Sequence, residues 1–216
     1  MWEMKVHRSS KLDNSISSKG EPVMKKNEST AEKILNAAFN SIAKHGCGAV
    51  TLRGIAEEAG VALSQLNYYY GNKDKLFVAV LNHMQQEYLA TLETRLEQTS
   101  TIREQIIALV DYNEYILHKN PDTYRNFLEF FNFAMCSKGF QTEVVKFTYG
   151  IASMIEKNIS RGESKRGVEG MFSASVVTRY ILSASFGIAL QHFLSPRNQD
   201  IWKGFEIIKA SAVQLV

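Results

Sequence analysis

A short stretch between positions 51 and 73 holds residues whose types and spacing could bond to nucleic-acid bases and phosphates. Gln65 and Asn67 carry side-chain amides, and an amide can make two hydrogen bonds to adenine in the major groove. Lys73 and several hydroxyl-bearing residues nearby could bond to phosphate oxygens. The hydroxyls belong to Thr51, Ser64, Tyr68 and Tyr69. These groups can act together only if a compact element presents them on one exposed face.

Other residue sets could carry catalysis or bind a metal, but each lacks the companions that its chemistry needs. Ser41 and Lys44 match a Ser-x-x-Lys pattern without any accompanying motif. His83 and Glu87 lie one helical turn apart, a spacing that an exposed polar helix face explains more simply than a metal site. The sequence therefore predicts no catalytic residue, no metal site and no cofactor, although a helical enzyme remains the main alternative class.

The two cysteines, Cys47 and Cys136, lie far apart in the chain. They form neither a disulfide framework nor the close spacing of a zinc site, so we expect reduced thiols. No apolar run approaches the roughly 20 residues that a membrane span needs, and the first residues do not read as a secretory signal. The sequence therefore predicts a cytoplasmic protein with no membrane partner.

The elements that would position residues 51–73 are two short helices joined by a tight turn. Thr51 can cap a helix over 52–59, Gly60 breaks it, and a second helix follows over about 62–69. Glycine adopts the backbone conformation of such a turn at low cost. The small and apolar residues Ile55, Ala56, Val61 and Leu66 would face inward. This pattern predicts a helix-turn-helix, whose second helix enters the major groove.

The rest of the 216-residue chain also reads as helical. Apolar residues make up 45% of the chain and recur at helical spacing, which predicts an all-α fold of nine helices. The net charge is only +3, with the basic excess in the front part of the chain, which fits contact with a polyanion but is a weak signal by itself. The helices beyond the helix-turn-helix are expected at 29–46, 74–97, 101–119, 122–136, 141–160, 171–194 and 200–216.

Residues 1–27 are polar and rich in Ser and Lys, which predicts a disordered arm. A basic arm that reaches DNA beside the main contact is the functional alternative. Met24 is an alternative translation start, because it leads directly into the first helix.

The ordered string of residues from Thr51 to Phe77 resembles the signature of the tetracycline-repressor (TetR) family of transcriptional regulators. Its matched parts are Thr51-Leu52-Arg53-Gly54-Ile55-Ala56, Ala59-Gly60-Val61, Leu66-Asn67-Tyr68-Tyr69-Tyr70, Lys73 and Leu76-Phe77. The resemblance runs from about residue 29 to 77. Asn67 stands where the family commonly has Tyr, and Ser64 where Gly is frequent, so no operator sequence can be carried over.

The resemblance implies a nine-helix TetR-like fold with an N-terminal three-helix helix-turn-helix domain and a C-terminal helical bundle. Residues 28–77 would bind DNA, and residues 78–216 would bind a ligand and dimerise. Carried over by position, Thr51, Tyr69 and Lys73 would contact phosphates, while Gln65 and Asn67 would read bases. The set is completed by Leu63, Ser64 and Tyr68 on the reading surface, and by Arg53, which is either a phosphate contact or simply solvated.

In the larger part, the resemblance implies a cavity for a small apolar or aromatic effector. Aromatic and sulfur side chains crowd this region, and we expect part of them to line the cavity. The residues expected to line it are Tyr112, Tyr115, Phe127, Phe131, Met135, Tyr149, Phe172 and Tyr180. Glu114, His118, Arg125 and Asn132 are possible polar contacts or ordinary surface residues.

The nearly uncharged helix 171–194 must be buried, and its small residues would let a partner helix approach closely. With 200–216 it would form a four-helix homodimer interface through Ser183, Gly187, Leu190 and Ile207. The resulting hypothesis is a homodimeric, ligand-released repressor acting on a near-palindromic double-stranded DNA operator. Besides an enzyme, the alternative is a helical adaptor protein without DNA binding.

Overall fold

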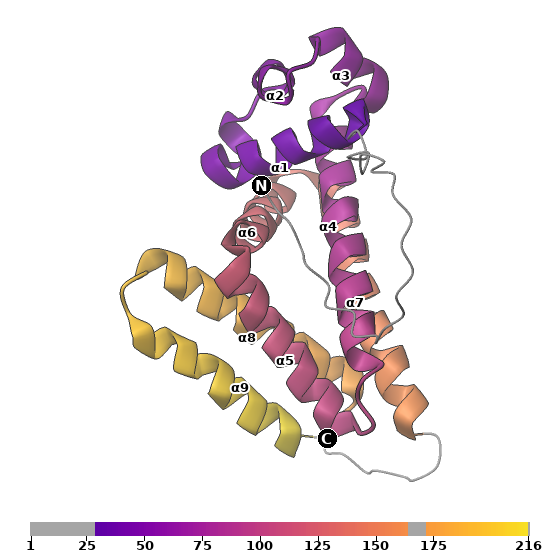
Figure 1. Ribbon diagram of the computed structural model, residues 1–216, viewed down its shortest axis with the longest axis vertical. Coiled ribbons are helices and arrows are strands. Elements are labelled where there is room, and N and C mark those ends of the chain that lie inside the picture. The colour runs from indigo at the N-terminus through magenta and orange to yellow at the C-terminus, as the bar shows by residue number, and fades with distance from the viewer. Residues whose placement is uncertain (1–28, 164–171, 216) are drawn as a thin grey trace, which may run out of the picture.

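A computed structural model describes residues 29–163 and 172–215, and every regular element in these ranges is a helix. Three helices form a compact unit at one end of the molecule, which we call the head (Figure 1). They are α1 (Thr30–Ala49), α2 (Leu52–Ala59) and α3 (Leu63–Tyr70). Both α2 and α3 pack against α1, so α3 lies at the outer edge of the head.

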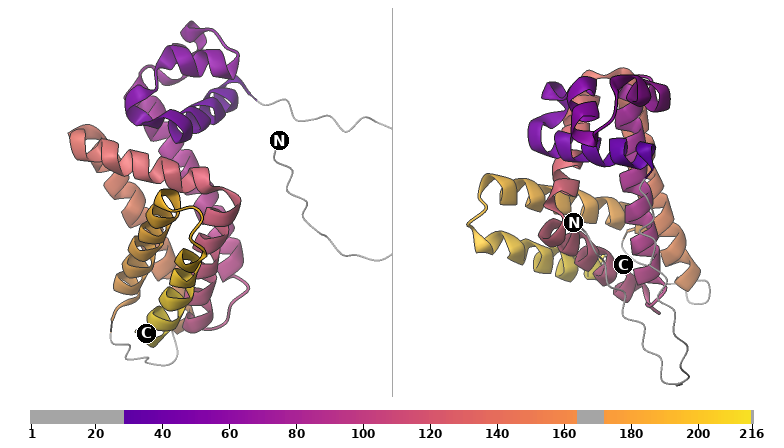
Figure 2. Two further views of the ribbon diagram at one scale, coloured as in Figure 1. Left: turned by 90° about the vertical axis from the view of Figure 1, so that its left-hand side faces the viewer. Right: turned by 45° about the horizontal axis from the view of Figure 1, so that its top comes forward.

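The remaining helices form a larger unit, the body. They are α4 (Lys73–Leu96), α5 (Ile102–Lys119), α6 (Pro121–Cys136), α7 (Lys138–Glu163), α8 (Ala174–Leu194), the 3₁₀ helix η1 (Gln199–Trp202) and α9 (Lys203–Gln214). Helix α4 runs from the head along the body beside α7, and α6 passes directly beneath α1 (Figures 1 and 2). Helices α8 and α9 pack together on one side of the body.

Side-chain caps fix where several helices begin. Ser29 and Glu32 form a capping box at α1, and Thr101 and Glu104 form another at α5. Each box satisfies backbone N–H groups that a helix start would otherwise leave unpaired. Asn72 caps α4 through its Oδ1 atom, which accepts a hydrogen bond from the Lys75 N–H.

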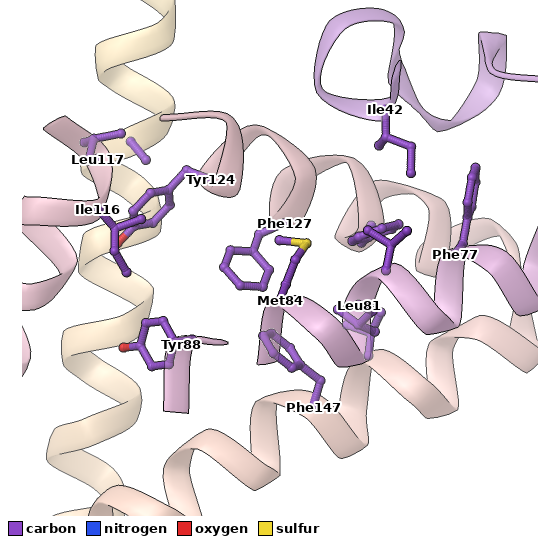
Figure 3. Close-up of a cluster of buried hydrophobic side chains, with 14 of the residues drawn as sticks. Ile42, Phe77, Leu81, Met84, Tyr88, Ile116, Leu117, Tyr124, Phe127 and Phe147 are labelled. Carbon is purple, nitrogen blue, oxygen red and sulfur yellow. The ribbon is translucent and has the colours of Figure 1, made fainter. Parts of the chain in front are cut away.

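One apolar core runs through the head and the body. Ile42 of α1 and Phe77 of α4 lie at its head end, while Tyr88, Tyr124 and Phe127 lie at its body end (Figure 3). Helix α4 carries buried residues along its whole length, from Leu76 to Leu96. Because close-packed side chains transmit displacement, the head and body are mechanically joined through α4 and α6.

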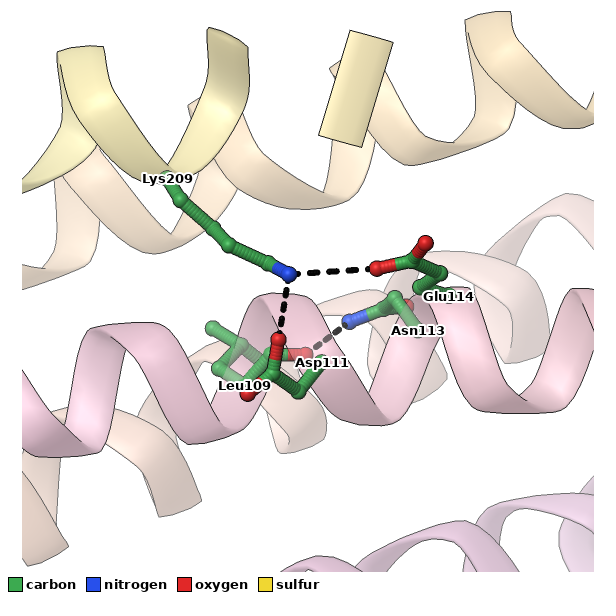
Figure 4. Close-up of polar contacts among 5 residues, drawn as sticks. All are labelled: Leu109, Asp111, Asn113, Glu114 and Lys209. Atoms are coloured by element: carbon green, nitrogen blue, oxygen red, sulfur yellow. Dashed lines mark hydrogen bonds and ion pairs between the residues drawn. The ribbon is translucent and has the colours of Figure 1, made fainter. Parts of the chain in front are cut away.

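A partly buried group of ion pairs connects α9 to α5. The Lys209 Nζ atom lies 2.5 Å from Asp111 Oδ1 and 3.1 Å from Glu114 Oε2 (Figure 4). Partial burial alone would lower the pKa of Lys209, but the hydrogen bonds that it donates to the two carboxylates raise the pKa above its usual value. Glu114 is therefore an ion-pair partner on the α5–α9 seam.

Several element boundaries differ from the sequence expectation. Helix α8 begins at Ala174 instead of 171, and α7 ends at Glu163 instead of 160. Helix α1 continues past Gly46 to Ala49 after a kink, because Gly46 takes φ 76° and ψ 156° inside the helical span. Helix α7 begins at Lys138 instead of 141, since Gly139 is accommodated within its first turn. Residues 200–202 form a 3₁₀ turn ahead of α9. The predicted arm, residues 1–27, and the loop 164–171 lie outside the described residues.

Candidate nucleic-acid interface and internal cavity

Helices α2 and α3 form the predicted helix-turn-helix. The Thr51 hydroxyl caps α2 by accepting a hydrogen bond from the Gly54 N–H at 3.1 Å. Gly60 ends α2 in the left-handed conformation, at φ 67° and ψ 33°, which glycine adopts without the steric cost that other residues meet. Ile55, Ala56 and Leu66 are buried between the helices, as the pattern predicted.

The α3 helix presents a polar and aromatic face to solvent. Ser64, Gln65, Asn67, Tyr68 and Tyr69 are exposed, and the Tyr68 ring is 85% accessible. A large aromatic side chain left this open costs hydrophobic free energy in the isolated chain, so a partner surface is expected to cover it. The geometry suits entry of α3 into a groove of DNA.

Two residues of this face have specific contacts within the chain. The Gln65 Oε1 atom accepts a hydrogen bond from the Ala62 N–H at 3.0 Å, which caps the start of α3. This bond uses one of the two lone pairs of Oε1 and holds the side chain against the start of α3, while the amide N–H₂ group has no partner among the described residues. Tyr70 is half-buried, and its hydroxyl donates to the Ala31 carbonyl at 3.0 Å, which fastens α3 to α1. Tyr70 therefore has a structural role within the head.

The residues predicted to contact phosphates lie around α3 and differ in solvent exposure. Thr51 and Arg53 are exposed at the start of α2, and Leu63 is half-buried at the start of α3. Lys73 is half-buried, with its Nζ atom 5.4 Å from the centre of the Phe77 ring. The Lys73 side chain would have to swing outward to reach a phosphate oxygen.

A cavity of about 370 Å³ opens in the body. Its lining residues are Tyr88, Asn113, Ile116, Tyr124, Phe127, Phe131, Phe147, Arg179, Leu182, Ser183 and Phe186. They come from α4, α5, α6, α7 and α8, and most are apolar or aromatic. Volume and lining are those of a small-molecule site.

The buried end of the cavity contains a hydrogen-bonded group of three side chains. Tyr124 donates its hydroxyl hydrogen to Asn113 Oδ1 at 2.8 Å, and Asn113 Nδ2 donates to the Tyr88 hydroxyl at 3.2 Å and to the Leu109 carbonyl at 2.8 Å. Burial raises the pKa of both tyrosines well above the usual value, so both hydroxyls stay protonated. Both rings project from their helices toward the interior (Figure 3).

The comparisons with known proteins agree with this geometry. The model of the family described as "Bacterial regulatory proteins, tetR family" matches residues 34–80. The transcriptional regulator BetI of Brucella anthropi is 36% identical over 81 residues, which cover 38% of this chain and 42% of BetI. The BetI of Brucella canis is 28% identical over 142 residues, which cover 64% of this chain and 72% of that protein.

The head of this chain resembles the DNA-binding region of the TetR family.

Solved structures of regulators share its whole fold. FadR from Bacillus subtilis, in complex with stearoyl-CoA, superposes with a TM-score of 0.73 at 14% identity and covers 85% of this chain and 98% of that one. A TetR transcription regulator from Haloarcula marismortui superposes with a TM-score of 0.68 at 22% identity and covers 86% and 95%. The matched helix-turn-helix region and the regulators among its relatives make this protein a DNA-binding transcriptional regulator.

The Ser41–Lys44 and His83–Glu87 sets have ordinary structural roles in this protein. Ser41 is buried, and its hydroxyl donates to the Glu58 carboxylate, which joins α1 to α2. His83 and Glu87 form an accessible pair on α4, with 3.5 Å between Nε2 and Oε1. Within the described ranges, no cluster of three potential metal ligands occurs, and no helix is long and apolar enough to cross a membrane.

Two of the eight residues predicted for a ligand pocket are among the described residues that line this cavity. Phe127 and Phe131 line it, but Tyr112 is buried against Tyr88 and Arg95 outside it. The other five predicted residues point away from the interior and are 39–78% exposed: Tyr115, Met135, Tyr149, Phe172 and Tyr180. Aromatic content identified the right helices but not the faces that turn inward. His118, Arg125, Glu114 and Asn132 do not line this cavity either.

Sequence reasoning missed the residues that give the cavity its polar character: Tyr88, Asn113 and Arg179. The first two fall on helical faces that otherwise read as ordinary core. A charged residue on a nearly uncharged helix was the available signal for Arg179. Its spacing with Leu182, Ser183 and Phe186 places all four on one face of α8.

Proposed function

We propose that this protein is a ligand-released repressor that binds a near-palindromic operator as a homodimer, in the cytoplasm where bacterial DNA lies. The observation that carries this proposal is the path of α4. Leu76 and Phe77 of α4 belong to the core shared with the head, while Tyr88 of the same helix lines the cavity. A ligand that touches Tyr88 therefore acts on a helix that also sets the position of the head.

We assign DNA binding to residues 28–77, and ligand binding and dimerisation to residues 78–216. At a rise of about 1.5 Å per residue, Phe77 and Tyr88 lie roughly 16 Å apart along α4. A ligand whose affinity differs between two positions of α4 shifts the population between them. Because both half-sites must be met together, a change in the separation of the two α3 helices lowers operator affinity.

Asn67 is the best candidate for reading a base. Its side chain is exposed on α3, and no hydrogen bond within the described part of the chain holds it, unlike that of Gln65. Asn67→Ala should cost about 1–3 kcal/mol for the cognate site and relax selectivity at one position. Fluorescence anisotropy on operator and scrambled DNA measures both effects. Unchanged selectivity in Asn67→Ala would refute the assignment.

Lys73 is expected to contact the phosphate backbone after its side chain turns outward from Phe77. Lys73→Ala should weaken binding to all sequences alike and reduce the slope of log affinity against log salt by about 1. The same anisotropy titrations at several salt concentrations give this slope. A sequence-dependent loss with an unchanged slope would remove Lys73 from the phosphate contacts.

Support for a homodimer comes from an outward apolar face on α8 and α9. Val176, Leu190 and Leu194 of α8 and Ile207 of α9 are 45–70% exposed. A side chain at Gly187 would meet no atom within 4 Å in this chain, so the outer surface there is open to a partner helix. Paired recognition helices would meet half-sites about 34–36 Å apart, or a multiple of this.

A direct test combines DNA upstream of the protein's own gene with a screen of small molecules. A ligand-released repressor forms a discrete complex with this DNA, and a ligand that raises the melting temperature also dissociates the complex. A helical adaptor protein would form no DNA complex at all. A ligand that tightens DNA binding would point to a co-repressor or activator mechanism and contradict ligand release.

A further inference from the structure

Arg179, the charged residue among the described residues of the cavity lining, indicates the chemical class of the ligand. If the cavity is the effector site, as the proposed function requires, we infer that the effector is an apolar or aromatic molecule with one carboxylate or equivalent anionic group, which binds Arg179. The remaining part of the molecule would lie among Phe127, Phe147 and Phe186.

Arg179 contributes to the cavity lining at its open side, because the residue is exposed to solvent. It shares one face of α8 with Leu182 and Ser183, both of which also line the cavity. Its guanidinium carbon lies 4.5 Å from the centre of the Tyr149 ring. An arginine packed on an aromatic ring keeps its planar N–H edge available, and this edge matches the two oxygens of a carboxylate.

No carboxylate of the described residues neutralises Arg179. The other arginines with ring contacts include Arg125, which also pairs with Asp122 at 3.4 Å. Arg179 makes no such ion pair with any residue whose side chain the structure describes. Among the described residues that line the cavity, Arg179 is the one with a charge. The field in the cavity therefore favours an anion over a cation.

The Tyr88 hydroxyl is a second, independent feature. It accepts a hydrogen bond from Asn113, and no acceptor for its own hydrogen is found among the described residues. Tyr88 is only 5% exposed, and a buried donor without an acceptor is costly. A ligand oxygen in the cavity would accept this hydrogen bond.

The volume limits the size of the ligand. About 370 Å³ is the volume of about a dozen water molecules in the liquid. An acid with one or two aromatic rings fits this space. A positive group on such a ligand could still stack on the aromatic rings, so a cation is the rival to be tested.

The test measures binding of matched probes to the full chain by thermal shift and fluorescence titration. The probes are phenylacetate, 2-naphthoate and 4-phenylbenzoate, the neutral amide of each, and (2-naphthylmethyl)trimethylammonium as the cation. At least one acid should bind about tenfold or more tightly than its amide, because a charged hydrogen bond is stronger than a neutral one. The cation should bind more weakly than 2-naphthoate.

Variants assign the effect to residues. Arg179→Gln should lower the affinity of the best acid about tenfold to a hundredfold and leave its amide unchanged. Arg125→Gln is the matched control, since this arginine also stacks on a ring but lies outside the cavity lining. Tyr88→Phe should weaken the acid several-fold. Circular dichroism melting confirms that each variant folds.

Three outcomes would overturn the inference: no acid binds more tightly than its amide, the cation binds best, or Arg179→Gln binds the best acid as tightly as the native chain. Following the operator complex in parallel separates this inference from the proposed function. Acid binding without release of DNA would refute ligand release but leave the anion site intact. Release of DNA by neutral or cationic probes alone would refute the anion site but leave the ligand-released mechanism intact.

Discussion

The kink at Gly46 allows a hydrogen bond between the head and the body. The Gly46 φ of 76° and ψ of 156° lie in a region that is essentially reserved for glycine, and the kink turns the Cys47 N–H toward α6. Glu129 of α6 accepts this N–H at 2.8 Å. A Cβ atom at Gly46 would lie 2.8 Å from the same carboxylate oxygen, so any side chain there disturbs both the backbone and the hydrogen bond.

Gly46→Ala should therefore destabilise the protein by about 1–3 kcal/mol. Gly48 is the matched control, because it is helical and a Cβ there would meet nothing within 4 Å. Gly48→Ala should be neutral or stabilise by up to about 1 kcal/mol. Chemical denaturation of both variants measures the difference. Equal stabilities would contradict the strained conformation assigned to Gly46.

The two thiols should differ in reactivity. Burial raises the pKa of the Cys47 thiol to about 12, and the Glu129 carboxylate adds to the rise, whereas Cys136 is exposed. Only a thiolate is a good nucleophile, so Cys47 stays protonated and inert at pH 8. Titration with a disulfide reagent at pH 8 should modify one thiol quickly, at Cys136, and the second only on unfolding. Two fast thiols in the folded protein would contradict this.

At the scale of elements, the sequence predicted the helix-turn-helix better than the body. Thr51 and Gly60 are strong local signals for the ends of α2, and the structure places them in those roles. The start of α7 was predicted three residues late, at 141, whereas the helix begins at Lys138 and includes Gly139 in its first turn. The inward faces of α5–α8 depend on how helices pack, which no local pattern specifies.

Within α3, neighbouring tyrosines should separate stability from DNA binding. Tyr70→Phe removes the hydrogen bond to the Ala31 carbonyl and should cost about 0.5–1.5 kcal/mol of stability. Tyr69 is 48% exposed, so Tyr69→Phe should leave stability unchanged but weaken DNA binding at every sequence. Thermal unfolding and anisotropy titrations test the pair. If Tyr69→Phe lowered stability and Tyr70→Phe weakened only DNA binding, the roles assigned to the two tyrosines would be contradicted.

At the scale of the whole molecule, the exposed apolar face of α8 and α9 determines the expected assembly. Val176, Leu190 and Leu194 recur at helical spacing on α8, and Ile207 extends the face onto α9. The sequence had suggested Leu190 and Ile207 for this interface from the apolar character of the helices. Ser183, suggested with them, lines the cavity while also being exposed, so it lies where the cavity meets this surface.

Leu190→Glu should dissociate the proposed dimer, because it would bury an unpaired charge between two apolar helices. Met135→Glu is the control, since Met135 is 78% exposed at the end of α6, away from α8 and α9. Light scattering at micromolar concentration should give a monomer for Leu190→Glu and a dimer for the native chain and Met135→Glu. A monomeric native chain would contradict the dimer.

The central claim is that α3 reads an operator for two subunits at once, and DNase footprinting on DNA upstream of the protein's own gene tests it most directly. The account predicts protection of two near-palindromic half-sites with centres about 34–36 Å apart or a multiple of this. Asn67→Ala, folded and dimeric, should lose this protection selectively while binding unrelated DNA as before. A single asymmetric footprint, or a footprint unchanged by Asn67→Ala, would contradict the account.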